Sequence, residues 1–199
     1  MVQGGASGGG AVDYVEVDQR EIQRLGGRRS RFPASQVVKD LIKPLDPAVL
    51  DVTYGRGRFY YLFRPRVLIG SDPFKWDWLV EPDAFYQLTA WALYHKLRRG
   101  EVRLPQEVTL VVADPPRWTR GAVYRGRDEF TALIGTPELI IRYAYETARL
   151  VGASHFLVHY SAVPELSGAQ VLKVVRFRYL SRYLNTRSKN TSYFVLYRL

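Results

Sequence analysis

The stretch LVVADPPRW, residues 110–118, passes from four apolar residues into an acid and two prolines. The apolar run Leu110–Ala113 predicts a buried strand. Pro115 and Pro116 cannot donate hydrogen bonds to a neighbouring strand, so the strand ends at or before Asp114. This pattern predicts a carboxylate and a rigid turn at one edge of a sheet, a position suited to chemistry. The alternative is a strand stop followed by a surface turn.

Helical patterns lie on both sides of this strand. Residues 81–100 predict a helix with Pro82 in its first turn and Gly100 behind its end. Residues 135–152 predict a second helix with Thr136 as its N-cap. Residues 47–59 predict a strand that runs into a glycine turn. Further strands are predicted at residues 66–73 and 154–162, and shorter helices at residues 17–27 and 35–45.

Strands that alternate with helices predict an α/β fold, with a mostly parallel sheet and helices on both of its faces. Residues 172–180 and 191–199 alternate in polarity and predict a closing antiparallel hairpin. Ligands of open parallel sheets bind outside the C-terminal ends of the strands. Asp51, Asp72 and Asp114 all fall at predicted strand ends, so we expect them to meet at one site.

The composition predicts one domain, residues 13–199, behind a flexible Gly-rich tail, residues 1–12. No apolar stretch approaches the ~18 residues that a membrane span needs. The N-terminal residues lack the basic and apolar segments of a signal peptide, so we expect a cytoplasmic protein without a membrane partner.

The chain carries a formal net charge of +10, from 29 lysines and arginines against 19 acids. Only six of the basic residues are lysine, and arginine suits bidentate phosphate contacts and stacking on bases. This surplus favours a nucleic-acid partner. A soluble, highly charged surface or a thermophile source would give the same composition. The absence of cysteine excludes thiolate metal sites, and the histidines lack metal-ligand spacing, so no metal is expected.

A second motif, LDVTYGRGRF at residues 50–59, runs from a strand into Gly55 and Gly57. Glycines at such a turn let a ligand approach the backbone without meeting a Cβ atom. Asp72 lies 21 positions after Asp51, close to the ~20 that separate the glycine turn's strand from a carboxylate that binds ribose hydroxyls from the second strand. Taken alone, two such glycines more often form an ordinary turn.

The ordered set of glycine turn, second acid and Asp-Pro-Pro resembles the S-adenosylmethionine-dependent methyltransferases, in particular the amino-methylating (adenine-N6/cytosine-N4) DNA methyltransferase group. Residues 51–59 match the family's DxxxGxGxF turn, and residues 114–116 match its DPPY/W motif. The resemblance covers residues 30–199 and implies a Rossmann-like methyltransferase fold with S-adenosylmethionine as cofactor. The cofactor-binding residues that we predict are Phe32, Pro33, Asp51, Thr53, Gly55, Gly57, Phe59, Asp72 and Asp77.

Asp77 is the candidate partner of the adenine ring because Trp76 and Trp78 flank it, although these tryptophans could also form a half-buried edge. The predicted catalytic residues are Asp114, Pro115, Pro116 and Trp118. The Asp114 carboxylate and the Pro115 carbonyl can each accept an N–H from an exocyclic amino group. Such bonds would aim the nitrogen lone pair at the methyl group of the cofactor.

The sequence departs from the family at Arg117, where an aromatic residue is expected, and Trp118 comes one position later. Either Trp118 stacks on the base, or the site is altered. Predicted substrate contacts are Arg117, Arg120, Arg125 and Arg127. The predicted function is methylation of an amino group on a nucleic-acid base, with DNA favoured over RNA. The alternative is an inactive methyltransferase-fold protein that serves as a basic nucleic-acid-binding module.

Overall fold

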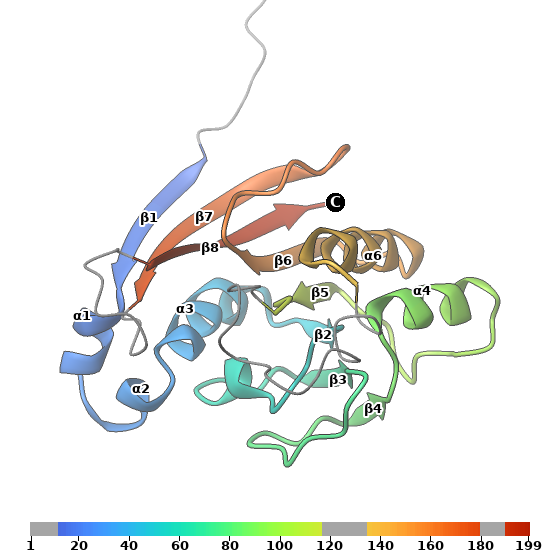
Figure 1. Cartoon of the computed structure of the whole chain (residues 1–199), viewed down its shortest axis with the longest axis horizontal. Helices are drawn as coiled ribbons and strands as arrows, with labels where there is room; N and C mark the ends of the chain where they lie inside the picture. Colours follow the sequence, from blue (N-terminus) through green and yellow to red (C-terminus); the bar gives the residue numbers. More distant parts are fainter. Residues whose placement is uncertain (1–11, 117–134, 180–189) are drawn as a thin grey trace, which may run out of the picture.

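The computed structural model describes residues 12–116, 135–179 and 190–199 (Figure 1). Nearly all of the predicted N-terminal tail lies outside these residues. So do five predicted site residues: Arg117, Trp118, Arg120, Arg125 and Arg127. Within the three described ranges, no helix is long and apolar enough to cross a membrane.

Strands and helices alternate through most of the chain. The strands are β1 (Asp13–Asp18), β2 (Ala48–Asp51), β3 (Val67–Ser71), β4 (Ala84–Tyr86), β5 (Leu110–Ala113), β6 (His155–Tyr160), β7 (Gln170–Tyr179) and β8 (Asn190–Arg198). The helices are α1 (Gln19–Arg24), α2 (Gly27–Arg31), α3 (Pro33–Ile42), α4 (Ala90–Arg98) and α6 (Pro137–Leu150), with short 3-10 turns η1 (Lys43–Leu45) and η2 (Arg58–Tyr60).

The strands form one eight-stranded sheet in the order β1-β7-β8-β6-β5-β2-β3-β4. All neighbours are parallel except β8, which runs antiparallel to both β6 and β7. The strand order reverses direction between β2 and β5, which makes their C-terminal ends the switch point of a doubly wound sheet. The predicted fold class, a mostly parallel Rossmann-like sheet with a C-terminal antiparallel hairpin, is confirmed.

Helices cover both faces of this sheet because each carries one apolar stripe. Helix α3 buries Val37, Val38 and Leu41 against one face. On the opposite face α6 buries residues at helical spacing, among them Ile140 and Ala144. Helices α4 and α6 lie side by side over this second face, whereas α1 lies near the ends of β1 and β7, and α2 contacts α1 and α3 (Figure 1).

The predicted helix at residues 81–100 is wrong in its first third. Residues Ala84–Tyr86 form strand β4, and α4 begins only after its N-cap Thr89, whose side chain accepts from the Ala92 N–H. Asp83 explains the difference, because its backbone N–H donates to the Leu68 carbonyl and its side chain accepts from the Leu68 N–H at 2.8 Å. Pairing with β3 therefore overrides the local helical pattern.

Strand β1 was not predicted from the sequence. Its backbone pairs in parallel with β7, and ion pairs connect the side chains of the two strands. Lys173 pairs with Asp13 at 2.7 Å, and both Arg176 and Arg178 pair with Glu16. These guanidinium groups lower the pKa of the Glu16 carboxyl. The contacts are made to residues far along the chain, so the local sequence of β1 does not reveal them.

The turn after β2 packs closely around the buried side chain of Tyr54. Its hydroxyl donates to the Val80 carbonyl at 2.7 Å. A Cβ atom on Gly57, whose φ is +70°, would lie 2.7 Å from both the Tyr54 hydroxyl and the Val80 oxygen. On β3, a Cβ atom on Gly70 would lie 2.7 Å from Cγ of the same tyrosine. Both glycines are therefore needed for packing.

We expect Gly57→Ala to destabilise the protein more than Gly100→Ala does. Gly100 has nearly the same φ, +71°, but a Cβ atom there would meet nothing within 4 Å. The control variant therefore isolates the conformational cost of about 1–2 kcal/mol. Overpacking against Tyr54 should add about 1–3 kcal/mol at Gly57. Equal free energies of unfolding for the two variants in urea would contradict this account.

Candidate functional site

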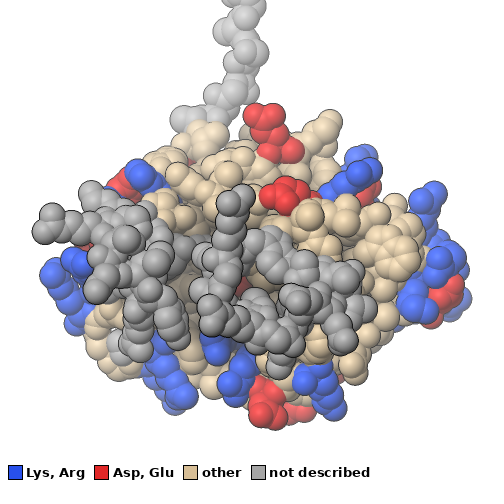
Figure 2. All heavy atoms as spheres, in the orientation of Figure 1, with Lys and Arg blue, Asp and Glu red and all other residues tan. Residues whose placement is uncertain are grey.

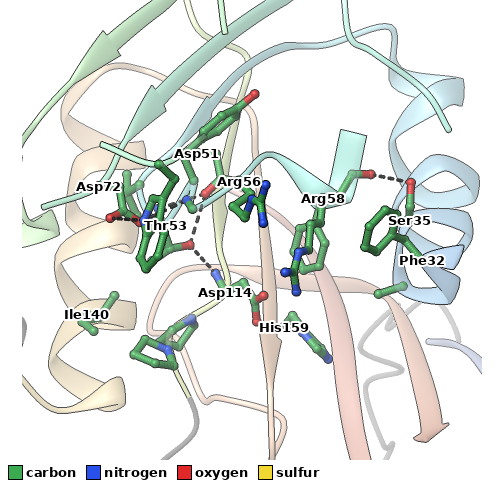
Figure 3. A pocket seen from close by; sticks show the side chains of 18 of the residues that line it. Phe32, Ser35, Asp51, Thr53, Arg56, Arg58, Asp72, Asp114, Ile140 and His159 are labelled. Atoms are coloured by element: carbon green, nitrogen blue, oxygen red, sulfur yellow. Dashed lines mark hydrogen bonds and ion pairs between the residues drawn. The ribbon is translucent and has the colours of Figure 1, made fainter. Parts of the chain in front are cut away.

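A cavity of about 730 Å³ opens at the C-terminal ends of β2, β3 and β5, at the switch point of the sheet (Figure 3). Its size lies within the range of small-molecule sites, about 300–1,000 Å³. Asp51, Asp72 and Asp114 all line it, as the sequence predicted for residues at neighbouring strand ends. The apolar wall includes Ile140 of α6 and Trp76.

Asp51 is the last residue of β2 and is only 2% exposed. One carboxylate oxygen accepts from the Thr53 N–H at 2.9 Å and from the Thr53 hydroxyl at 3.1 Å. The other oxygen accepts from the Tyr60 hydroxyl at 2.9 Å. Burial raises the pKa of Asp51 to about 7, and the nearby Asp114 carboxylate acts in the same direction, against the lowering effect of the hydrogen bonds.

The hydroxyl of Thr53 joins two strand ends. It donates to Asp51 and accepts from the backbone N–H of Asp114 at 2.6 Å. Strand β2 is paired with β5 in the sheet, and this side-chain link continues their contact beyond the last paired residues. The link therefore fixes where the Asp-Pro-Pro turn starts relative to the glycine turn.

Asp72 directly follows β3 and organises the opposite wall of the cavity. One oxygen accepts from the Gly55 N–H at 3.0 Å. The other accepts from the Phe74 N–H at 2.9 Å and from the Trp76 indole N–H at 3.0 Å. Burial raises the pKa of this carboxyl. A carboxylate offers about four acceptor positions, so these three bonds leave room for one donor from a ligand.

Asp114 follows β5, and its side chain pairs with His159 of β6. The distance from the carboxylate Oδ1 to the imidazole Nδ1 is 2.9 Å, and the Nε2 atom lies 2.9 Å from the Ser192 hydroxyl on β8. Asp114 keeps 38% of its side chain exposed, whereas the His159 side chain is 10% exposed. The pair thus links the Asp-Pro-Pro turn to the antiparallel strand.

Arginines and aromatic rings form another part of the cavity lining. Arg31 and Arg58 place their guanidinium carbons 5.5 Å and 5.6 Å from the centre of the Phe32 ring. Arg56 also lines the cavity, and its Nε donates to the Asp77 carbonyl at 2.8 Å. Among the described residues, Arg31, Arg56 and Arg58 have no carboxylate within ion-pair distance. They are therefore available to an anionic ligand.

The cavity brings together ten of the predicted site residues. These are Phe32, Pro33, Asp51, Thr53, Gly55, Phe59, Asp72, Asp114, Pro115 and Pro116. Two others, Gly57 and Asp77, do not line it. Gly57 faces Tyr54 and Val80 inside the protein, and Asp77 is exposed. In the described part of the chain, no group of three acidic or histidine side chains could hold a metal ion.

Sequence reasoning missed several lining residues, among them Arg31, Arg56, Arg58 and His159. Arg56 and Arg58 alternate with the turn glycines, and this alternation could have identified them. Trp76 was placed beside Asp77 in the prediction, whereas its indole binds Asp72. His159 was not among the predicted site residues. The available signal was its position near the end of a strand that pairs with β5. Recognising this signal requires the strand order, which the sequence alone does not give.

No protein-family profile matches the sequence, and no curated protein matches it. A solved structure that is similar is magnesium protoporphyrin IX methyltransferase (ChlM) from Synechocystis PCC 6803, crystallised with bound SAM. The similarity covers 90% of this chain and 83% of that chain, with a TM-score of 0.46 and 12% sequence identity.

The raised pKa of Asp51 predicts a pH-dependent stability that Asp51→Asn removes. A carboxyl whose pKa is raised by folding stabilises the protein most below its unfolded pKa, about 3.9, and loses that contribution as the pH rises toward about 7. Between pH 5 and pH 7 the free energy of unfolding of the wild type should fall by about 1–3 kcal/mol more than that of the variant. Urea unfolding at several pH values measures this. A difference in unfolding free energy between the two proteins that does not change with pH would contradict the prediction.

Proposed function

We propose that the chain binds S-adenosylmethionine in this cavity and transfers the methyl group to an exocyclic amino group of a nucleic-acid base. One observation carries the proposal: Asp51, Asp72 and Asp114 line a single cavity at the switch point, beside Pro115 and Pro116. Ligands of doubly wound sheets bind at this place. The three acids came from the motifs on which the family resemblance rests.

The cofactor fits the residues around Asp72 and the glycine turn. The free acceptor position on Asp72 suits a ribose hydroxyl, and Trp76 with Pro73 offers an apolar wall for adenine. A Cβ atom built on Gly55 would meet nothing closer than the Thr53 carbonyl at 3.9 Å, so space for a ligand lies over that glycine. Carboxylates nearby favour a positively charged sulfonium group.

When bound, the cofactor supplies a methyl carbon that leaves its sulfur with the electron pair staying on sulfur, as the bond to nitrogen forms. Asp114 and the Pro115 carbonyl act on the acceptor. Each accepts one N–H of the amino group, which draws the nitrogen lone pair out of conjugation with the ring. The methylated nitrogen then gives one proton to the Asp114 carboxylate, which is exposed enough to pass it to water.

The charge of the molecule supports a nucleic-acid substrate. Arg31, Arg56 and Arg58 line the same cavity as the acids, and the net charge of the chain is +10. On the face seen in Figure 2, lysine and arginine side chains lie around the periphery, with acidic side chains between them. Arginine binds phosphate oxygens in a bidentate manner and stacks on bases, so these groups suit a strand whose base enters the cavity.

A second candidate function is nucleic-acid binding without methyl transfer. The observation that favours it is the contact between His159 and Asp114, because it occupies one of the oxygens that would accept the amino group. A protein of this kind would bind the cofactor and nucleic acid but leave both unchanged. The first experiment below separates the two functions.

Incubation with methyl-labelled S-adenosylmethionine and a mixture of DNA and RNA should place label in nucleic acid. Asp114→Ala should lower the rate of labelling about 10²- to 10³-fold, because the acceptor for the amino group is lost. Cofactor affinity, measured by calorimetry, should stay within a few-fold of the wild type.

Asp40→Ala is the matched control, since it removes an exposed carboxylate of α3 outside the cavity. Label in nucleic acid that disappears only with Asp114→Ala supports the proposed function. Cofactor binding without any labelling supports the second candidate. Failure to bind the cofactor at all would refute both.

Substitution of the cavity arginines should change how salt affects nucleic-acid binding. If Arg56 and Arg58 contact phosphates, Arg56→Ala and Arg58→Ala should each lower the slope of log Kd against log salt by about 0.7–0.9. Arg98→Ala removes the same charge from the exposed end of α4 and should leave the slope unchanged. Equal slopes in all variants, together with weaker cofactor binding, would assign these arginines to the cofactor instead.

A further inference from the structure

We infer that His159 is a positioning residue that orients the Asp114 carboxylate toward the amino group to be methylated. The inference rests on the proposed function for its effect on the reaction, but the contact itself can be tested without any activity. Neither the motifs nor the comparisons assign a role to this histidine. It lies on β6, next to β5 in the sheet, and lines the cavity.

The imidazole ring is held on several sides. Phe194 stacks on it at 3.9 Å between ring centroids and an interplanar angle of 6°. Phe59 meets it edge-on at 5.8 Å. Its two nitrogens lie 2.9 Å from Asp114 and 2.9 Å from Ser192. A ring fixed by packing on its face and by a polar partner at each nitrogen has little freedom to rotate.

The partners also select the tautomer. An ionised carboxylate only accepts hydrogen bonds, so the Nδ1 atom facing Asp114 must carry the hydrogen. The Nε2 atom of a neutral ring is then an acceptor, and the Ser192 hydroxyl can donate to it. The hydroxyl of Ser192 is buried, which keeps this partner in place. In its neutral form the ring can satisfy both contacts, provided that Nδ1 carries the hydrogen.

This arrangement assigns different tasks to the two carboxylate oxygens of Asp114. Oδ1 of Asp114 accepts from His159, and the backbone N–H of Asp114 donates to the Thr53 hydroxyl. With Oδ1 held, Oδ2 is left as the acceptor for an amino N–H and for the proton released after methyl transfer. A neutral His159 would hold the carboxylate without adding a positive charge, whereas an arginine at the same place would always add one.

Two substitutions separate the hydrogen bond from the packing. His159→Phe keeps a ring that can stack on Phe194 but has no donor for Asp114. His159→Asn loses the ring but can place an amide N–H near the position of Nδ1. We expect kcat to fall about 10²-fold in His159→Phe, with KM and cofactor affinity unchanged, because a misaligned acceptor slows the chemical step. His159→Asn should restore most of kcat.

A spectroscopic measurement tests the contact independently of turnover. The chain has three histidines, so ¹⁵N-histidine NMR should resolve them, with His159→Asn assigning the signals. The wild type should show His159 as the Nδ1–H tautomer. Asp114→Ala should shift this tautomer toward Nε2–H, whereas His155, which lies 2.9 Å from the Ser154 hydroxyl, should not change.

The outcomes separate this inference from the proposed function. An Nε2–H tautomer in the wild type, or full kcat in His159→Phe, would overturn the role of His159 while leaving methyl transfer intact. Absence of methylation by the wild type would refute the proposed function, and the tautomer measurement would still decide the contact. Higher activity in His159→Phe would show that the histidine blocks Asp114, which also overturns the inference.

Discussion

The site depends on the two hydrogen bonds of the Thr53 hydroxyl. By donating to Asp51 and accepting from the Asp114 N–H, this one oxygen connects the glycine turn after β2 with the Asp-Pro-Pro turn after β5. The two prolines cannot donate hydrogen bonds to a neighbouring strand, so the contacts of Asp114 with Thr53 and His159 anchor the chain after β5. Asp51 accepts the hydrogen bond from the Thr53 hydroxyl and is itself buried, so this connection is held rigidly.

The cavity has two electrostatic regions. One is formed by the buried or half-buried carboxylates Asp51 and Asp72, and the other by exposed arginines. Asp51 and Asp72 are desolvated, and burial raises the pKa of both. They tolerate this because each accepts three hydrogen bonds. The arginines are instead at the exposed side of the same cavity, where their charge is hydrated at little cost. A ligand with a cationic centre and an anionic chain would find complementary partners in both regions.

The sequence predicted those features whose signal is local. Apolar runs that end in an acid located β2, β3 and β5, and the Thr136 cap located α6. It failed where a distant partner decides the outcome. β4 forms because its residues and Asp83 pair with β3, and β1 forms because its backbone pairs along β7. His159 enters the site for the same reason, since only the strand order brings β6 beside β5.

The two glycines of the turn show how a motif can combine unrelated constraints. Gly57 is enclosed by Tyr54 and Val80, so packing within the protein alone accounts for it. Gly55 has open space where its side chain would be, and its N–H donates to Asp72. Its φ of +53° favours glycine, but packing does not demand one. A match to GxG is therefore evidence mainly for a turn. The evidence for a ligand site comes from Gly55 and the carboxylates beside it. The argument for a cofactor is stronger than the motif alone would give, because Asp72, which was identified from its spacing, accepts a hydrogen bond from the N–H of Gly55.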